Sequence, residues 1–249
     1  MQILRCFLLC LPLAACATAP PTATAPAADF VPLFNGVDLS GWKIPEGDNG
    51  HWRVVDGVID YDACSEAKGE KHLYTEKSYG DYVLHVEWRL KETPYQNANV
   101  PIILADGTHK KGNDGKEIKL VVADADSGIY VRGDGKSQVN IWSWPVGSGE
   151  VYGYRMDEKM PTEVRAGVTP VRNADHDIGS WNTFEITMRG DRLTVVNNGI
   201  KVIDNAHLPG VPLRGPIALQ HHGDKNPANG EWWSPPALVQ FRNIKIREL

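Results

Sequence analysis

Residues 181–204 read WNTFEITMRGDRLTVVNNGIKVID, and their hydrophobic residues recur largely at every second position. Phe184, Ile186 and Met188 share one face, which is the pattern of a half-buried β-strand. Gly190-Asp191 is a turn signal, and Asn198-Gly199 is a strong signal for a two-residue hairpin. The stretch therefore predicts three antiparallel strands in series.

The same rhythm extends in both directions along the chain. Trp52–Tyr61 holds two short apolar runs joined by Asp56-Gly57, and the segment 82–90 alternates cleanly over nine residues. Segments with helical periodicity are almost absent. Many short strands at hairpin spacing predict an all-β fold, an antiparallel β-sandwich or jelly roll. We expect the strand at the C-terminus, within 237–249, to lie beside the first strand after the leader.

The first 28 residues differ in composition from the rest. One Arg and an apolar run of about ten residues precede Cys16, and this run is shorter than the ~20 residues of a membrane span. It predicts an export signal over residues 1–15. Leu13-Ala14-Ala15-Cys16 resembles a bacterial lipobox, which implies lipidation of Cys16; the alternative is a plain secretory signal. Ala17 in place of Asp implies an outer-membrane lipoprotein that faces the periplasm.

Residues 16–28 are rich in Pro, Ala and Thr and predict an extended tether, and residues 29–249 predict a single β-sandwich domain. Once the signal is removed and Cys16 is lipidated, Cys64 has no partner for an intramolecular disulfide. The net charge is −5 and the sequence contains no long basic run, which argues against nucleic acid as a partner. The expected membrane contact is the lipid anchor.

The segment 33–42, LFNGVDLSGW, resembles the N-terminal signature of the 3-keto-disaccharide hydrolase family, formerly domain of unknown function 1080. The resemblance continues in order through WRVVDGVI, SGIYVRG, WNTFEITMRGDRLTVVNNG, LRGPIALQHHG and VQFRNIKIREL. It implies a concanavalin A-like jelly roll. In such a fold we expect the 33–42 segment to be structural, with a turn that seats Trp42 against the edge of the sandwich.

The resemblance also implies a substrate: a glycoside or oligosaccharide already oxidised to a ketone at C3. A C3 ketone acidifies the C2 proton, so a base can remove it and the C1 aglycone can leave by β-elimination, with or without later hydration. Such an enzyme needs a base, a group that stabilises the enolate, and a proton donor for the leaving oxygen. It does not need the paired carboxylates of ordinary glycosidases.

The segment 215–222, GPIALQHH, provides the candidate base. If Ile217 and Leu219 face the core, His221 points inward as a packing residue. Gln220 and His222 then share the opposite face, where His222 is the candidate base and Gln220 a candidate substrate ligand. A structural role for His222 in ordering the next loop is the alternative.

The segment 137–144, SQVNIWSW, provides a candidate sugar platform. If Val139 and Ile141 face the core, Gln138, Asn140 and Trp142 project together from the other face. Commoner members of the family carry a Glu-x-Gln-like pair at this strand, so the amides of this chain predict substrate binding rather than catalysis. The alternative is a solvated edge strand.

The remaining candidates lie near the strand 127–133 and in the polar connection 145–180. Arg132 is a candidate for enolate stabilisation, Glu150 for proton donation and Tyr154 for substrate contact; each has an ordinary structural role as its alternative. No cofactor is implied with certainty, and a divalent metal ion on His222 and a nearby carboxylate stays open. A lipid-anchored carbohydrate-binding module without catalysis is the competing function, and a structural envelope domain is a third.

Overall fold

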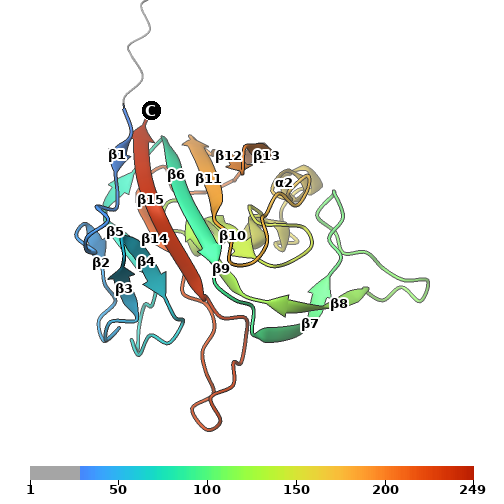
Figure 1. Cartoon of the computed structure of the whole chain (residues 1–249). Helices are drawn as coiled ribbons and strands as arrows, with labels where there is room; N and C mark the ends of the chain where they lie inside the picture. Colours follow the sequence, from blue (N-terminus) through green and yellow to red (C-terminus); the bar gives the residue numbers. More distant parts are fainter. Residues whose placement is uncertain (1–28) are drawn as a thin grey trace, which may run out of the picture.

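The computed structural model describes residues 29–249, so the predicted signal peptide (1–15), the lipobox Cys16 and the tether (16–28) lie outside the described residues. Two antiparallel sheets contain most of the strand residues and pack face to face (Figure 1). Within residues 29–249, no helix has the length and apolar character needed to cross a membrane. The expected all-β sandwich of jelly-roll type is confirmed.

The larger sheet has eight strands. Along its main path it contains, in spatial order, β13 (Ile200–His207), β12 (Arg192–Asn197), β11 (Asn182–Arg189), β6 (Tyr82–Leu90), β15 (Val239–Glu248), β4 (Val58–Tyr61) and β3 (Trp52–Val55). The short β1 (Val31–Pro32) pairs with β15. The sequence segment 181–204 thus forms three neighbouring strands, as its alternation predicted.

The second sheet has five strands, in the order β10 (Gln138–Trp142), β9 (Asp126–Tyr130), β14 (Gly215–Leu219), β5 (Leu73–Tyr79) and β2 (Trp42–Lys43). A separate hairpin of β7 (Tyr95–Pro101) and β8 (Lys119–Asp124) projects from one side of the sandwich (Figure 1). A single turn of 3-10 helix, η1 (Gly135–Ser137), joins β9 to β10.

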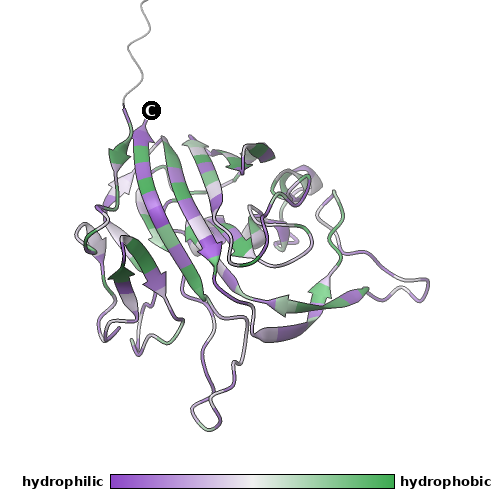
Figure 2. Ribbon diagram, in the orientation of Figure 1, coloured by the Kyte–Doolittle hydropathy of each residue, from purple (hydrophilic) through white to green (hydrophobic). Residues whose placement is uncertain are grey.

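The core lies between the inner faces of the two sheets. Along β6 every second side chain is buried, from Tyr82 to Leu90, and none of these five exposes more than 3% of its surface. The bands of alternating hydropathy on β6 and β15 in Figure 2 show the same period of two. Removal of these side chains from water is the main stabilising contribution to the sandwich.

The two ends of the domain lie side by side (Figure 1). Val31 pairs with Ile246 and Pro32 with Lys245, which confirms the expected contact between the first and last strands. Trp42 exposes 4% of its surface, and its indole N–H donates to the carbonyl of Leu33 at 2.9 Å. The 33–42 segment is therefore structural, as expected.

The connection 145–180 contains more regular structure than the sequence indicated. The segment 145–180 holds two short helices, α1 (Tyr152–Arg155) and α2 (Thr162–Gly167), where a polar connection without helices was expected. Both are too brief to display a helical repeat, so the hydrophobic pattern gave no signal for them. The segment 92–125 forms the two strands β7 and β8.

His85, Glu87 and Arg89 lie on the solvent face of the eight-stranded sheet. Glu87 accepts from Nε of Arg242 at 2.7 Å, and its pKa is lowered because hydrogen bonds from Asn243 and Arg242 outweigh the effect of burial. All three side chains are hydrogen-bonded to β15, and Glu87–Arg242 is also an ion pair. The row lies on the outer face of the eight-stranded sheet, on the opposite side of the sandwich from the site described next.

Candidate functional site

A cavity of about 410 Å³ hollows the outer face of the five-stranded sheet. Strands β9 and β10 and the residue after β14 form its floor. The start of α1, the chain before it and the 222–235 loop form its walls. Its lining residues are Asn97, Asp126, Gly135, Gln138, Asn140, Trp142, Trp144, Tyr152, Gly153, Gln220, His222 and Pro235. Five of the sequence-predicted candidates meet here: Gln138, Asn140, Trp142, Gln220 and His222.

The alternation of β10 accounts for three of these side chains. Val139 and Ile141 are fully buried in the core, so the residues between and beside them project to the outer face. Strand β10 pairs with β9, and β9 pairs with β14. This order brings β10 close to Gln220, which follows the end of β14. The fold therefore brings together the side-chain amides of Gln138 and Gln220, which are 82 residues apart in the sequence.

Two of the amides bond to each other across the floor. Nε2 of Gln138 donates to Oε1 of Gln220 at 2.6 Å and to the carbonyl of Ser127 at 3.2 Å. Gly128 lies beneath this contact, and a Cβ built on it would come within 2.3 Å of Nε2 of Gln138. Only glycine leaves room for this arrangement of the Gln138 side chain.

Asn140 lies deep in the cavity and exposes 3% of its surface. Within residues 29–249 its side-chain amide has no hydrogen-bond partner, although its backbone N–H donates to the carbonyl of Glu150 at 2.9 Å. A buried amide without a protein partner is costly unless water or a ligand satisfies it. Asn140 can therefore offer both a donor and an acceptor to a bound molecule.

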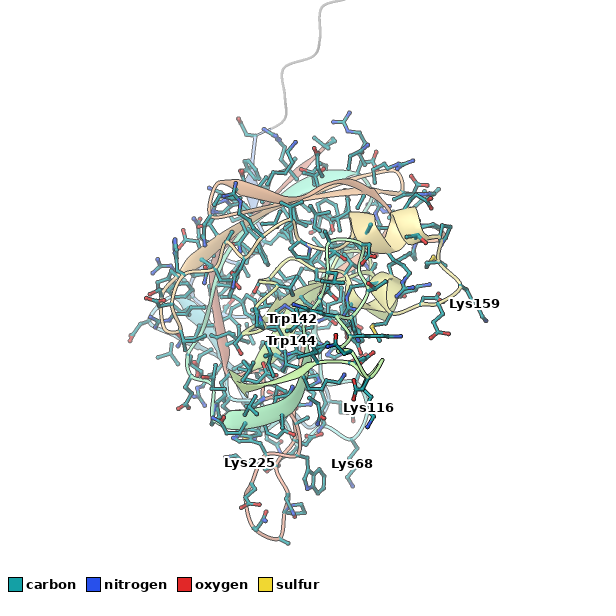
Figure 3. All side chains as sticks on the ribbon, turned by 90° about the vertical axis from the view of Figure 1, so that its right-hand side faces the viewer. Lys68, Lys116, Trp142, Trp144, Lys159 and Lys225 are labelled. Carbon is teal, nitrogen blue, oxygen red and sulfur yellow. The ribbon has the colours of Figure 1, made fainter. Side chains whose placement is uncertain are left out.

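Aromatic rings form one wall. Trp142 stacks on Trp144 with ring centroids 4.1 Å apart and planes 8° apart, and the two lie together in Figure 3. The ring of Tyr152 meets Trp142 edge to face at 6.2 Å. Trp142 exposes only 3% of its surface, so Trp144 and the more exposed Tyr152 present the accessible aromatic surface. Such surfaces pack well against the C–H groups of a sugar ring.

His222 is fixed by the loop that follows β14. Its Nδ1 lies 2.5 Å from the carbonyl oxygen of Pro235, which can only accept, so Nδ1 carries the proton and donates. In the neutral ring Nε2 then holds a free lone pair. Nε2 lies 3.8 Å from Oδ2 of Asp126, at the bottom of the cavity.

Asp126 is the acidic partner that sequence reasoning missed. Burial raises its pKa to about 7, and the nearby His222 opposes this shift. Its side chain still exposes 21% of its surface because it lies at the floor of a concave site, surrounded by protein but reached by solvent. Oδ1 is buried and has no hydrogen-bond partner within the described part of the chain. The two acidic residues Asp124 and Asp126 were the available signal in the sequence.

His221 points the other way. Its Nδ1 lies 2.6 Å from the hydroxyl of Tyr61, whose ring stacks on Trp52 with centroids 3.7 Å apart. Burial, assisted by the charge of Lys71, lowers the pKa of His221 to about 4. His221 therefore packs between the two sheets against Tyr61 and does not line the cavity.

Arg132 does not lie in the site, contrary to the expectation that it would face the substrate. Its side chain is fully buried and donates to the carbonyls of Gly80, Gly190 and Pro212 at 2.6–3.0 Å and to Asp81 at 3.0 Å. The strand β9 ends at Tyr130, so the alternation that predicted an outward position no longer applies at residue 132. Through these hydrogen bonds Arg132 connects the turn after β5, the turn after β11 and the chain before β14.

Glu150 and Tyr154 are also buried outside the cavity. Oε1 of Glu150 accepts from Nε of Arg155 at 2.5 Å, and neither side chain has exposed surface. Burial raises the pKa of Glu150 to about 7, against the opposing effect of Arg155. The hydroxyl of Tyr154 donates to the carbonyl of Pro209 at 3.1 Å. The aromatic residue of this segment that does line the cavity is Tyr152.

Within residues 29–249, no group of three or more His, Cys, Asp or Glu side chains is arranged to hold a metal ion. His222 and Asp126 supply two groups of this kind at the cavity floor. The chemistry that these residues can perform by themselves is proton transfer between an imidazole and a carboxyl with a raised pKa.

Residues 29–247 match the family model described as the 3-keto-alpha-glucoside-1,2-lyase-like domain. No curated protein matches the chain significantly. Among solved structures, three proteins of Parabacteroides distasonis assigned as glycosyl hydrolases share the fold. One is 21% identical, with a TM-score of 0.54 over 89% of this chain and 84% of the other. A second is 17% identical, with a TM-score of 0.52 over 88% and 94%.

Proposed function

The chain belongs to the 3-keto-α-glucoside-1,2-lyase-like family, whose named activity is on carbohydrates, and we propose that it cleaves glycosides that carry a ketone at C3. The observation that supports this most directly is the pair of His222 and Asp126 at the floor of an amide-lined cavity. A base with a free lone pair and an acid with a raised pKa are what an elimination beside a ketone requires.

The reaction begins at C2 of the oxidised sugar. The C3 carbonyl acidifies the C2–H bond, so loss of that proton forms an enolate across C2 and C3. The enolate then re-forms the C3 carbonyl, a double bond forms between C1 and C2, and the bond from C1 to the aglycone oxygen breaks. The products are an unsaturated 3-keto sugar and the free aglycone alcohol; addition of water at C1 would complete a net hydrolysis.

In this proposal Nε2 of His222 takes the C2 proton. The Nδ1–H bond to Pro235 fixes the tautomer that leaves Nε2 free. Asp126 gives its proton to the leaving oxygen, since a pKa of about 7 lets its carboxyl carry a proton near neutral pH. An imidazolium and a carboxylate 3.8 Å apart then remain, and transfer of the proton between them restores the starting state.

The amides hold the sugar and its developing charge. Donor groups that are already in place stabilise an enolate oxygen without reorganising during the reaction. The Asn140 side-chain amide has no hydrogen-bond partner within residues 29–249 and faces the cavity, so it is our choice for contact with the C3 oxygen. The paired amides of Gln138 and Gln220 would bind sugar hydroxyls, and Trp144 with Tyr152 would cover the ring.

The test compares oxidised and unoxidised substrates. The domain 29–249 should release aglycone from a 3-keto-glucoside and leave the parent glucoside intact, because only the ketone acidifies C2–H. Release is followed with a chromogenic aglycone and, separately, by the absorbance of the unsaturated ketone. Equal binding of the two compounds with turnover of neither would instead identify a carbohydrate-binding module.

The cellular location is a separate proposal that rests on the sequence. The lipobox at residues 13–16 and the Pro-rich tether favour a lipoprotein of the outer membrane that faces the periplasm. An enzyme there would meet glycosides as they enter the cell.

A further inference from the structure

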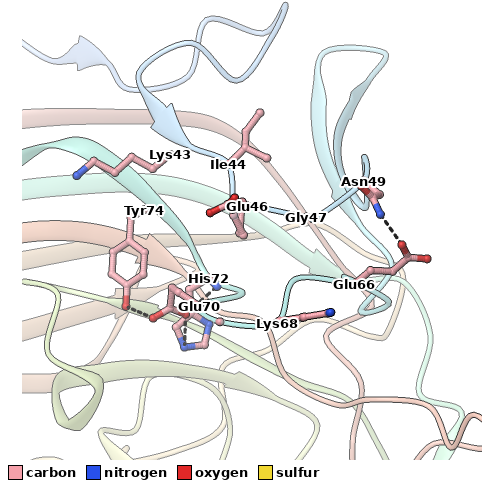
Figure 4. Close-up of a pocket in the computed structure, with 12 residues that line it drawn as sticks. Lys43, Ile44, Glu46, Gly47, Asn49, Glu66, Lys68, Glu70, His72 and Tyr74 are labelled. Atoms are coloured by element: carbon pink, nitrogen blue, oxygen red, sulfur yellow. Dashed lines mark hydrogen bonds and ion pairs between the residues drawn. The ribbon is translucent and has the colours of Figure 1, made fainter.

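A second and larger cavity, of about 930 Å³, lies on the same outer face beside strands β5 and β2 (Figure 4). Its lining comes from three stretches of the chain, 43–49, 66–70 and 72–74. The proposed catalytic pair does not reach it, and none of the predicted site residues lines it. Its possible ligand can be inferred from where it lies relative to the first cavity.

Strand register places the two cavities along one line. One residue from each of the five strands forms a row of direct cross-strand partners: Gln138, Tyr130, Ala218, Tyr74 and Lys43. Direct partners in an antiparallel sheet project from the same face. The row begins on the floor of the first cavity with Gln138 and ends in the lining of the second with Tyr74 and Lys43. Four steps between strands of about 4.8 Å span roughly 19 Å, which exceeds the width of a single sugar ring.

A chain of hydrogen bonds follows the same line. Gln138 donates to Gln220, whose side chain lies close to the Tyr130 hydroxyl. On the other side the backbone N–H of His221 donates to Nδ1 of His72 at 3.0 Å, so Nε2 of His72 holds the proton and donates to the Tyr130 hydroxyl at 3.0 Å. Tyr130 therefore accepts from His72 and lies between the two cavities, buried under the side chains around it.

The polar groups of the second cavity suit a neutral, hydroxyl-rich ligand. Lys43, Glu46 and Lys68 have no hydrogen-bond or ion-pair partner within residues 29–249, and they surround the space in Figure 4. Charges of both signs can donate to and accept from sugar hydroxyls, whereas a strongly anionic or cationic ligand would meet one repelling group. Tyr74, whose hydroxyl donates to Glu70 at 3.3 Å, offers a ring face beside them.

We propose that the second cavity is the binding site for the sugar aglycone, so that the preferred substrate class is 3-keto-oligosaccharides rather than glycosides of small alcohols. The proposal rests on the proposed function, since it places the oxidised ring beside His222. The aglycone is attached at C1, next to the C2 that loses its proton. From there the remaining sugar units would extend along the outer face of the sheet, in the direction of the row, to Tyr74 and Lys43.

The test is a comparison of substrate lengths in the domain 29–249. Wild type is assayed with methyl 3-keto-α-glucoside and with maltotriose oxidised at C3 of its non-reducing end. We expect kcat/KM to be at least about tenfold higher for the trisaccharide, since two or more extra hydrogen bonds are made. The double variant Lys43→Ala/Lys68→Ala should remove most of that preference and leave turnover of the methyl glycoside unchanged.

The matched control is Lys116→Ala/Lys159→Ala, which removes the same charge from exposed positions outside both cavities (Figure 3). It should keep the preference for the trisaccharide. Equal turnover of the two substrates by wild type, or a preference that survives in Lys43→Ala/Lys68→Ala, would overturn the proposal.

A binding measurement separates this proposal from the proposed function. Calorimetric titration with unoxidised maltotriose and methyl α-glucoside needs no chemistry. Tighter binding of maltotriose that is lost in Lys43→Ala/Lys68→Ala supports the aglycone site even if no keto sugar is turned over. Turnover of methyl 3-keto-α-glucoside without any dependence on length overturns the aglycone site alone.

Discussion

His221 and His222 are adjacent in the chain, yet their side chains point to opposite sides of the five-stranded sheet. His221 bonds to Tyr61 beneath the sheet at 2.6 Å, and His222 lines the outer cavity, where it bonds to Pro235. The period of two that governs β14 continues for these residues beyond the end of the strand. The two histidines can therefore be tested against each other.

His222→Asn should lower kcat by about 10²–10⁴ and leave the fold intact. The asparagine amide can stand in for Nδ1–H and keep the bond to Pro235, but it offers no basic nitrogen in place of Nε2. Turnover and melting temperature are measured together. Near-normal turnover by a stable His222→Asn would show that the base lies elsewhere.

His221→Ala should have the reverse effect. It removes the partner of the Tyr61 hydroxyl, and Tyr61 has no exposed surface, so the free energy of unfolding should fall by about 1–3 kcal/mol. Activity per folded molecule should change little. Denaturant unfolding gives the stability, and an active-site titration normalises the rate. A large loss of activity without loss of stability would place His221 in the site after all.

Asp126→Asn should stabilise the protein at alkaline pH. The carboxyl has a pKa of about 7 when folded and about 3.8 when unfolded, so between these values the folded state binds more protons than the unfolded one. Its ionisation therefore costs stability as pH rises from about 4 to 7. The variant escapes this cost, and its melting temperature should exceed that of wild type at pH 8 but not at pH 4. Activity should fall at both values.

Asp157→Asn is the control for this pH dependence. A hydrogen bond from Lys136 and another from the backbone of Lys159 lower the pKa of Asp157. Its ionisation therefore stabilises the folded state as pH rises, whereas ionisation of Asp126 destabilises it. Loss of that carboxylate should not raise the melting temperature at pH 8. The same increase in both variants would mean that the Asp126 effect reflects net charge alone.

Gly128→Ala should weaken substrate binding. The added Cβ would lie 2.3 Å from Nε2 and 2.7 Å from Cγ of Gln138, so this side chain would have to turn away and would lose its bonds to Gln220 and to the carbonyl of Ser127. We expect KM to rise about tenfold, as for the loss of one or two hydrogen bonds. Gly80→Ala is the control, since its Cβ would meet no atom closer than 3.7 Å. An unchanged KM in Gly128→Ala would exclude the amide pair from substrate binding.

The alternation of polar and apolar residues predicted the faces of the strands, and through them much of the cavity. It placed Gln138, Asn140 and Trp142 on the outer face because Val139 and Ile141 had to be inside. The same rule separated His221 from His222. Strand periodicity is a local property, so a single sequence is enough to read it.

Contacts between distant segments could not be predicted in this way. Asp126 meets His222 across 96 residues, and its raised pKa depends on burial that only the folded chain creates. Tyr154 was predicted to contact the substrate because the segment 145–180 was expected to be irregular, which gives no basis for choosing between neighbouring tyrosines. In the helix α1, residues two apart project about 200° from each other, so Tyr152 faces the cavity and Tyr154 the core.

Cys16→Ser tests the proposed lipid anchor. Wild type should sediment with membranes and incorporate labelled palmitate, because acyl chains on Cys16 and its amine give stable attachment. The variant should be soluble or remain unprocessed. Wild type recovered wholly from the soluble periplasmic fraction would favour the plain secretory signal.

Arg132→Met should unfold the protein more easily without altering the chemistry. The arginine satisfies the carbonyls of Gly80, Gly190 and Pro212, and methionine fills a similar volume without donating to any of them. Each buried carbonyl left without a donor costs about 1–3 kcal/mol, so a total loss of roughly 3 kcal/mol or more is expected. Below its lowered melting temperature the variant should keep a normal KM and kcat per folded molecule. A stable variant with a reduced kcat would return Arg132 to the active site and contradict its position in the structure.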